Sequence, residues 1–173
     1  MNGCARFAVC GAGASQRKGY AMADFVKPEQ VLLDVTCETK DAALEMLSKK
    51  AAELGIAESE EAAKAAFDAR EEEGTTGMMD GFAVPHAKSA AIKRAAVIVQ
   101  RFASPVTDWE AIDDSPITLA IALLVPDGEA GSTHITLLSQ VARALMDTEF
   151  RAAIREASDP AAVADLINGR LDA

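Results

Sequence analysis

The chain has 173 residues, half of them hydrophobic and a quarter charged, a composition typical of one globular domain with a sizeable core. Its formal net charge of -10 argues against nucleic acid as the main partner, because phosphate backbones are bound by clustered Lys and Arg side chains. No apolar run approaches the roughly 20 residues that a membrane-spanning helix needs, so we expect no direct membrane insertion.

The N-terminal segment differs from the rest of the chain. It is basic and rich in small residues, and its apolar part is too short for a secretory signal. The three cysteines, Cys4, Cys10 and Cys37, lack the spacing of a zinc site or a CxxC pair, and their odd number favours a reducing cytoplasm. We predict that residues 1–21 form a flexible leader and that residues 22–173 form one domain.

The first elements of the domain are a strand and two helices. Val31–Val35 alternates as a short strand, and Thr39 or Asp41 caps a helix that runs to about Glu53. A second helix spans roughly Ser59–Glu72, with acidic residues in its first turn. Its predicted core contacts are Ala62, Ala66 and Phe67.

A glycine-rich loop precedes the most informative segment. Gly74–Gly81 holds three glycines in eight residues, which indicates unusual backbone angles or a close approach to a neighbour. Phe82 opens a strand that Pro85 must end or place at an edge, because proline has no N–H for the ladder. His86 is therefore predicted just beyond a strand, where functional groups are often displayed. The acidic run Glu71–Glu73 is interpreted as a solvated helix end.

Two nearly continuous apolar runs follow, Ala95–Phe102 and Ile117–Val125, and they are typical of strands that helices cover on both faces. Ser104–Ser115 is predicted to connect them. After the loop Pro126–Gly131, a helical period runs from Ser132 to near Met146.

Two short helices complete the chain. They are predicted over Thr148–Ala157 and over Asp159–Ile167, the second closed by Asn168-Gly169. Helices that flank a mixed sheet make the expected fold class α/β.

Both histidines of the chain lie at junctions between a loop and an element, which favours a chemical role. An imidazole with an ordinary pKa of about 6.5 is largely neutral and nucleophilic at neutral pH, so His86 is a candidate reversible phosphate acceptor. His134 lies in the first turn of a predicted helix, where free N–H groups and the helix dipole favour an anion. The simpler alternative for His134 is a surface histidine that caps its own turn.

Three further residues are candidates for binding phosphate. Arg70 lies near the end of the second helix, and its planar guanidinium matches phosphate oxygens. Thr75 and Thr76 offer hydroxyl donors. The alternatives are a solvated arginine and two ordinary loop residues. Neither a close histidine pair for a metal, a GxSxG elbow nor a P-loop is present in the sequence.

Several motifs, in the correct order, carry a resemblance to a known family. The segment Gly81–Ala87, with its Pro-His pair, resembles the active-site signature of the type-2 enzyme IIA domains of the sugar phosphotransferase system. The stretch from Arg70-Glu71 to Thr75-Thr76-Gly77 and the block Pro126–Ser139, which is followed by Ala142–Leu145, are also similar to that family. The resemblance covers about residues 25 to 171.

The resemblance implies a mixed sheet of about five strands flanked by helices and a phosphotransferase activity with a phosphohistidine intermediate. Phosphate passes in such systems from phosphoenolpyruvate to enzyme I, to the carrier HPr, to the IIA histidine and then to a IIB cysteine. His86 then matches the phosphorylated histidine, through Nε2, and His134 and Arg70 match the residues that steady the phosphoryl group. Neither a metal nor a nucleotide cofactor is required. The chain is expected to be a free-standing IIA protein that meets its IIB partner in trans and serves a IIC membrane permease indirectly.

Three functional hypotheses stay open at this point. The first is a carrier for sugar uptake, with fructose as the leading sugar. The second is a nitrogen-type regulatory protein whose phosphorylation controls its binding to a target. The third, and weakest, is a non-enzymatic α/β module with a fortuitous motif.

Overall fold

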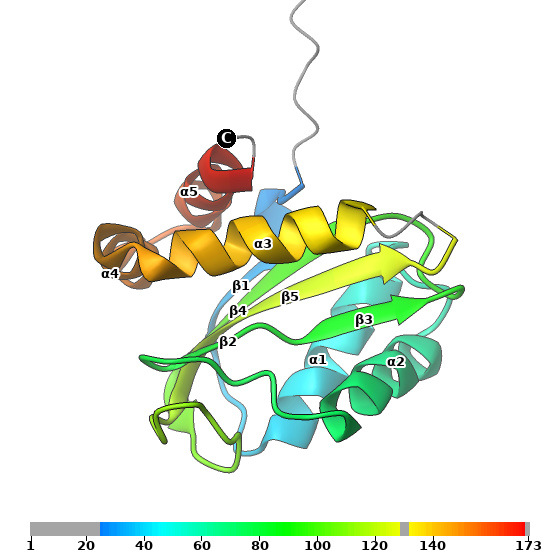
Figure 1. The fold of residues 1–173 in the computed structure, drawn as a ribbon, viewed down its shortest axis with the longest axis horizontal. Coiled ribbons are helices and arrows are strands. Elements are labelled where there is room, and N and C mark those ends of the chain that lie inside the picture. Colours follow the sequence, from blue (N-terminus) through cyan, green and yellow to red (C-terminus); the bar gives the residue numbers. More distant parts are fainter. Residues whose placement is uncertain (1–24, 129–131, 172–173) are drawn as a thin grey trace, which may run out of the picture.

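A computed structural model describes residues 25–128 and 132–171, without the side chains of residues 132–134. Residues 1–21, predicted to be a leader, lie outside this part, as do Cys4 and Cys10. The described chain forms a five-stranded mixed sheet with helices on both faces (Figure 1). The strands are β1 (Val31–Val35), β2 (Phe82–Ala83), β3 (His86–Ser89), β4 (Ala96–Val106) and β5 (Ile117–Pro126).

The sheet is built around β5. Strand β4 pairs with β5 antiparallel and with β1 parallel, whereas β2 and β3 both pair parallel with the other edge of β5. Strand β5 and the Ala96–Phe102 part of β4 are mostly buried, as expected for apolar runs that are covered on both faces, whereas residues 103–105 of β4 are exposed. The predicted α/β class and mixed five-stranded sheet are confirmed.

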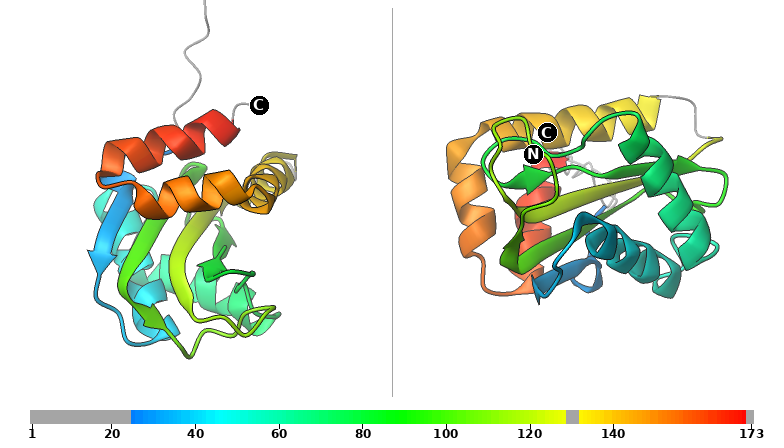
Figure 2. Two further views of the ribbon diagram at one scale, coloured as in Figure 1. Left: turned by 90° about the vertical axis from the view of Figure 1, so that its left-hand side faces the viewer. Right: turned by 90° about the horizontal axis from the view of Figure 1, so that it is seen from below.

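The helices form two layers. The helical elements are a single 3-10 turn (Pro28–Gln30), α1 (Lys40–Glu53), α2 (Glu60–Glu72), α3 (Ser132–Met146), α4 (Thr148–Glu156) and α5 (Pro160–Leu171). Helices α1 and α2 cover one face of the sheet, and α3 and α5 lie on the other (Figures 1 and 2). Two apolar clusters, one under each layer, form the core. Within the described part of the chain, no helix combines the length and apolar character needed to cross a bilayer.

The caps of α1 and α2 follow the sequence closely. The hydroxyl of Thr39 accepts a hydrogen bond from the backbone N–H of Ala42, and Ser59 caps α2 through Ala62 in the same way. Thr39, rather than Asp41, is thus the cap of α1.

The prediction of the core-facing positions of α2 was partly wrong. Phe67 is buried, with 1% of its surface exposed, and Ala63 rather than Ala62 accompanies it. Ala62 and Ala66 are only partly buried because they border a cavity beside α2, but Ala66 packs against the core as predicted.

Three predicted boundaries also change. Strand β4 continues through Pro105 to Val106, with an irregular register that accommodates the proline in the ladder. His86 begins strand β3 instead of a loop, because pairing with β5 resumes directly after Pro85. Helix α5 runs through Asn168 and Gly169, and the Asn168 side chain pairs with both backbone groups of Val26.

Candidate active site

His86 projects from an edge of the sheet beside α2. Phe82 pairs with Leu119 and His86 with Leu123, so the register is the same on both sides of Pro85. The carbonyl of Pro85 accepts a hydrogen bond from Leu123, 2.9 Å away, which keeps the proline in line with the ladder. Because successive side chains of a strand alternate, Ala87 is buried and the half-buried His86 faces outward.

The hydrogen bonds of the His86 ring fix its tautomer. Nδ1 lies 2.8 Å from the carbonyl oxygen of Val84, and a carbonyl only accepts, so Nδ1 carries the proton. Nε2 therefore holds the lone pair, and this nitrogen accepts a hydrogen bond of 2.7 Å from Nε of Arg70. The reactive nitrogen of the neutral ring is thereby directed away from the sheet and toward a cation.

Arg70 reaches His86 from the last turn of α2. Its Nη1 donates to the carbonyl oxygen of Gly74 at 2.9 Å, so the guanidinium bridges the helix end, the glycine-rich loop and the imidazole. The structure thus brings together Arg70 and His86, two residues that the sequence predicted for the site, from the two sides of the glycine-rich loop.

The two threonines of the loop already have acceptors within the protein. The hydroxyl of Thr75 donates to the carbonyl of Glu110, and that of Thr76 donates to Glu71 at 2.6 Å. Thr76 is also buried, with 4% of its surface exposed. Their direct contact with a phosphate stays a prediction, and it requires each hydroxyl to rotate away from its present acceptor.

His134 lies in the first turn of α3, the position predicted for it. Its side chain is outside the described residues, so its proposed contact with an anion stays a prediction. By residue type, the sequence also predicts Ser132 or Thr133 as the cap of α3, and both side chains lie outside the described residues.

A cavity of about 690 Å³ opens beside His86. One wall is a face of α2 with four alanines and Arg70, and another is strand β3 with His86 and Lys88. Lys88 was not predicted from the sequence as a residue of the site. Its spacing from His86 could have identified it, since residues two apart on a strand share a face and His86 was already a candidate. Its ammonium also pairs with Asp127 at 3.6 Å.

Two glycines let the loop pass close to other segments. A Cβ on Gly77 would lie 2.0 Å from the carbonyl oxygen of Glu110, and one on Gly81 would lie 2.9 Å from Oγ1 of Thr118. Gly81 also has φ of +74°, which disfavours any other residue. The predicted close approach of this loop to a neighbour is confirmed.

A clamp of two arginines holds the tip of the loop. The carboxylate of Asp80 accepts hydrogen bonds from Arg155 at 3.0 Å and Arg151 at 2.9 Å, and these bonds lower the pKa of Asp80, Arg155 contributing most. The guanidinium of Arg155 also lies over the ring of Phe82, 4.6 Å from its centroid. Helix α4 thereby fixes the loop from the far side.

Three large apolar side chains, Met78, Met79 and Phe82, lie at the end of the glycine-rich loop. Phe82 is fully buried in the core, and Met78 packs partly against it, so neither forms an exposed rim. Met79 alone is open to solvent, with 38% of its surface exposed. Among the described residues, no group of three or more His, Cys, Asp or Glu side chains is arranged to hold a metal ion.

A protein-family model matches most of the chain. The family model described as phosphoenolpyruvate-dependent sugar phosphotransferase system, EIIA 2, matches residues 24–169.

The relatives include sugar-specific components of the phosphotransferase system and nitrogen regulatory proteins. The chain is 34% identical over 139 residues to a fructose-specific EIIA component of Haloferax volcanii, covering 80% of this chain and 89% of the relative. It is also 34% identical over 140 residues to a nitrogen regulatory protein of Bradyrhizobium diazoefficiens, covering 81% and 90%. A 2-O-alpha-mannosyl-D-glycerate-specific EIIABC component of Escherichia coli is 35% identical over 133 residues, 76% of this chain, but the chain spans only 20% of that longer protein.

Solved structures agree on the fold. The nitrogen regulatory protein IIA-Ntr of Neisseria meningitidis superposes with a TM-score of 0.76 at 26% identity, covering 83% of this chain and 97% of that one. Enzyme IIAMTL of Escherichia coli, solved in complex with phosphorylated enzyme IIBMTL, superposes with a TM-score of 0.70 at 21% identity, covering 83% and 97%.

Proposed function

The chain belongs to the EIIA 2 family of the phosphoenolpyruvate-dependent sugar phosphotransferase system, and we propose that it is a phosphocarrier whose acceptor atom is Nε2 of His86. The observation that carries this proposal is the hydrogen bond from Nδ1 to the Val84 carbonyl, which leaves the lone pair on Nε2. The donor is HPr in its phosphohistidine form, and the acceptor is the cysteine of a IIB protein.

The transfer is a direct exchange of bonds to phosphorus. The lone pair of Nε2 attacks the phosphorus of the donor phosphohistidine, a new N–P bond forms, and the electron pair of the old N–P bond returns to the donor nitrogen. In the second step the thiolate of the IIB cysteine attacks the same phosphorus, and the pair of the Nε2–P bond returns to His86. Positioning and electrostatics supply most of such a catalysis.

Arg70 has two successive positions in this scheme. A lone pair that accepts a hydrogen bond from Nε of Arg70 is not available for attack, so the guanidinium turns from Nε2 to the phosphoryl oxygens as the donor arrives. There its fork neutralises the charge of the transferring group. His134, Thr75 and Thr76 are proposed as further phosphate contacts.

The cavity beside His86 is the proposed docking site for both partners. Donor and acceptor must each reach Nε2, so they use the same opening in turn. The alanines of α2 present a flat wall of short side chains, which allows a partner helix to approach the imidazole closely.

We place this activity in the cytoplasm, with residues 22–173 as the carrier domain and residues 1–21 as a leader outside it. Fructose is the leading sugar, since a fructose-specific EIIA component is among the relatives. The IIB partner would pass the phosphate to sugar at a IIC permease, which this chain meets only indirectly.

A second candidate function is regulation through phosphorylation-dependent binding to a target protein. The observation that favours it is the equal identity, 34%, of the nitrogen regulatory relative.

One experiment separates the two functions. The chain is incubated with enzyme I, HPr and phosphoenolpyruvate, and candidate IIB proteins are then added. Transfer of the phosphoryl group from the chain to a fructose IIB supports transport. A chain that stays phosphorylated because no IIB accepts the phosphoryl group supports regulation. A chain that takes up no phosphate contradicts both.

A further inference from the structure

We infer that Glu71 is a positioning residue of the active site, which sets the orientation of His86 through the loop that follows α2. The inference rests on the proposed role of His86. The acidic run in the sequence predicted that Glu71 lies in a solvated helix end, and this was wrong, because only 6% of its side chain is exposed.

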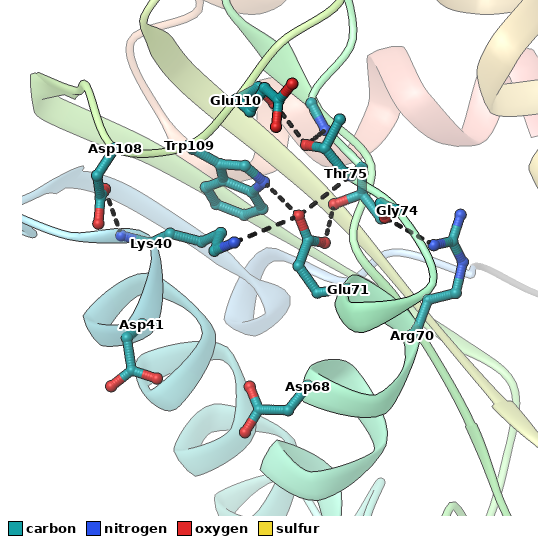
Figure 3. A network of polar contacts seen from close by, with 12 residues as sticks. Lys40, Asp41, Asp68, Arg70, Glu71, Gly74, Thr75, Asp108, Trp109 and Glu110 are labelled. Atoms are coloured by element: carbon teal, nitrogen blue, oxygen red, sulfur yellow. Dashed lines mark hydrogen bonds and ion pairs between the residues drawn. The ribbon is translucent and has the colours of Figure 1, made fainter.

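The carboxylate of Glu71 is the centre of a polar network (Figure 3). Its Oε1 accepts hydrogen bonds from the indole Nε1 of Trp109 at 3.1 Å and from the backbone N–H of Thr76 at 3.2 Å. Its Oε2 accepts the hydroxyl of Thr76 at 2.6 Å, and the ammonium of Lys40 lies 3.9 Å from Oε1. A buried carboxylate is costly unless it has such donors, so this one is held in a single place.

A continuous run of hydrogen bonds leads from this carboxylate to the imidazole. Glu71 holds Thr76 through both its N–H and its hydroxyl. The carbonyl of Thr76 accepts the N–H of Val84 at 2.9 Å, and the carbonyl of Val84 accepts Nδ1–H of His86. The tautomer of His86 therefore depends on where Val84 lies, and Val84 is anchored to the residue that Glu71 grips.

Glu71 also supports the position of Arg70, whose Nε donates to Nε2 of His86. Arg70 precedes it in the last turn of α2, and Arg70 donates to the carbonyl of Gly74 in the same loop. Because Glu71 fixes Thr76, the loop between these residues is tied to the helix at two points. Both nitrogens of the His86 ring thus have partners whose positions Glu71 supports.

Trp109 extends the support to the other side of the loop. Its ring is buried, with 2% of its surface exposed, and it follows strand β4. Thr75 binds the carbonyl of the next residue, Glu110. The Glu71 carboxylate therefore joins α2, the loop and the β4–β5 connection at a single point.

The test compares Glu71→Ala and Glu71→Gln with a matched control, Glu72→Ala, which removes the exposed carboxylate of the neighbouring residue. Glutamine has the same length and keeps an oxygen for Thr76 and Trp109, so it should rescue most of the function. Phosphate transfer from phospho-HPr is measured over a range of donor concentrations. The tautomer of His86 is measured separately, by NMR correlation of its ring nitrogens in the unphosphorylated protein.

We expect Glu71→Ala to lower the maximal transfer rate about a hundredfold with little change in the donor concentration at half-maximal rate, since misplacement of a reacting group costs on that order. We expect Glu71→Gln to lose less than about tenfold, as a neutral hydrogen bond replaces a charge-assisted one. His86 should be protonated at Nδ1 in the wild type, in Glu71→Gln and in Glu72→Ala, and should become a mixture of tautomers in Glu71→Ala.

Should Glu71→Ala not fold, Thr76→Val keeps the volume of the threonine and removes its hydroxyl bond to Glu71. Because this hydroxyl is also a proposed phosphate contact, the readout for Thr76→Val is the tautomer of His86 in the unphosphorylated protein, which should shift in the same direction. A wild-type rate and an unchanged Nδ1–H tautomer in Glu71→Ala, or an unchanged tautomer in Thr76→Val if that alone folds, would overturn the inference. The tautomer measurement needs no phosphate donor. If the wild type accepts no phosphate, the proposed function fails, whereas the positional role of Glu71 is still decided by the NMR signals.

Discussion

Nε of Arg70 lies 2.7 Å from Nε2 of His86, so the ring nitrogen that carries the lone pair is covered by a permanent cation. The same guanidinium is bound to the carbonyl of Gly74. This contact orients the imidazole in the absence of a partner, and it places a fork of N–H donors beside the proposed site of phosphoryl attachment.

Arg70→Lys should lower the rate of phosphate acceptance by about a hundredfold, because lysine keeps the charge but loses the planar fork that binds two phosphate oxygens at once. The rate is measured by single-turnover transfer of label from phospho-HPr. Arg94→Lys, at an exposed arginine, is the matched control and should transfer at the wild-type rate. Equal rates for the two variants would show that the fork of Arg70 has no part in transfer.

His134→Ala should slow the same transfer by about tenfold to a hundredfold without abolishing it, since the variant loses one charge-assisted hydrogen bond to phosphate. The first turn of α3 keeps its backbone N–H groups and dipole in the variant. A rate equal to that of the wild type would place the phosphate contacts elsewhere.

Gly77→Ala should lower the free energy of unfolding by about 1–3 kcal/mol, as is usual when an extra methyl group is forced into a packed site. The new Cβ would lie 2.0 Å from the carbonyl oxygen of Glu110, so the loop must move. Urea unfolding measures the change. Gly128→Ala is the control, because its Cβ would meet no atom within 4 Å and should change stability by no more than about 0.5 kcal/mol. Equal stability of the two variants would contradict the close approach at Gly77.

Acid should destabilise the protein partly through Asp113. The pKa of this carboxyl is lowered from 3.8 to about 2, chiefly because the backbone N–H of Asp80 donates to it, with further bonds from Ser115. The unfolded chain lacks these bonds and takes up the proton at higher pH, so their contribution is complete above about pH 4 and is lost as the pH falls to about 2. Asp113→Ala should therefore be less stable at neutral pH and should show a shallower loss of thermal stability across that interval. The same slope as the wild type would contradict the assignment.

Local signals in the sequence were enough for the regular elements. The Thr39 and Ser59 caps, the apolar run of β5 and the period of α3 each arise from interactions within a few residues, so the bounds of these elements could be predicted closely. Strand β4 instead continues past its predicted end at Phe102 to Val106. The end of α5 could not be predicted, because the Asn168 side chain forms two hydrogen bonds with the backbone of Val26, which is distant in the sequence.

The candidate site was predictable in its main residues but not in its support. His86 and Arg70 were found because a proline, a glycine-rich loop and a helix end precede the histidine in order. The burial of Glu71 depends on Trp109 and Lys40, which come from distant segments, so its neighbours in sequence suggested only a solvated acidic run. Lys88 was missed because its place beside His86 follows from a strand whose pairing resumes after Pro85.

The central claim is that Nε2 of His86 takes and releases a phosphoryl group. The most direct measurement is mass spectrometric and NMR analysis of the chain after incubation with enzyme I, HPr and phosphoenolpyruvate, for the wild type and for His86→Ala. We expect one acid-labile phosphoryl group on Nε2 of His86 in the wild type and none in the variant, which should fold normally. Acid-labile phosphate that persists in His86→Ala, or that is attached to Nδ1 in the wild type, would contradict the account.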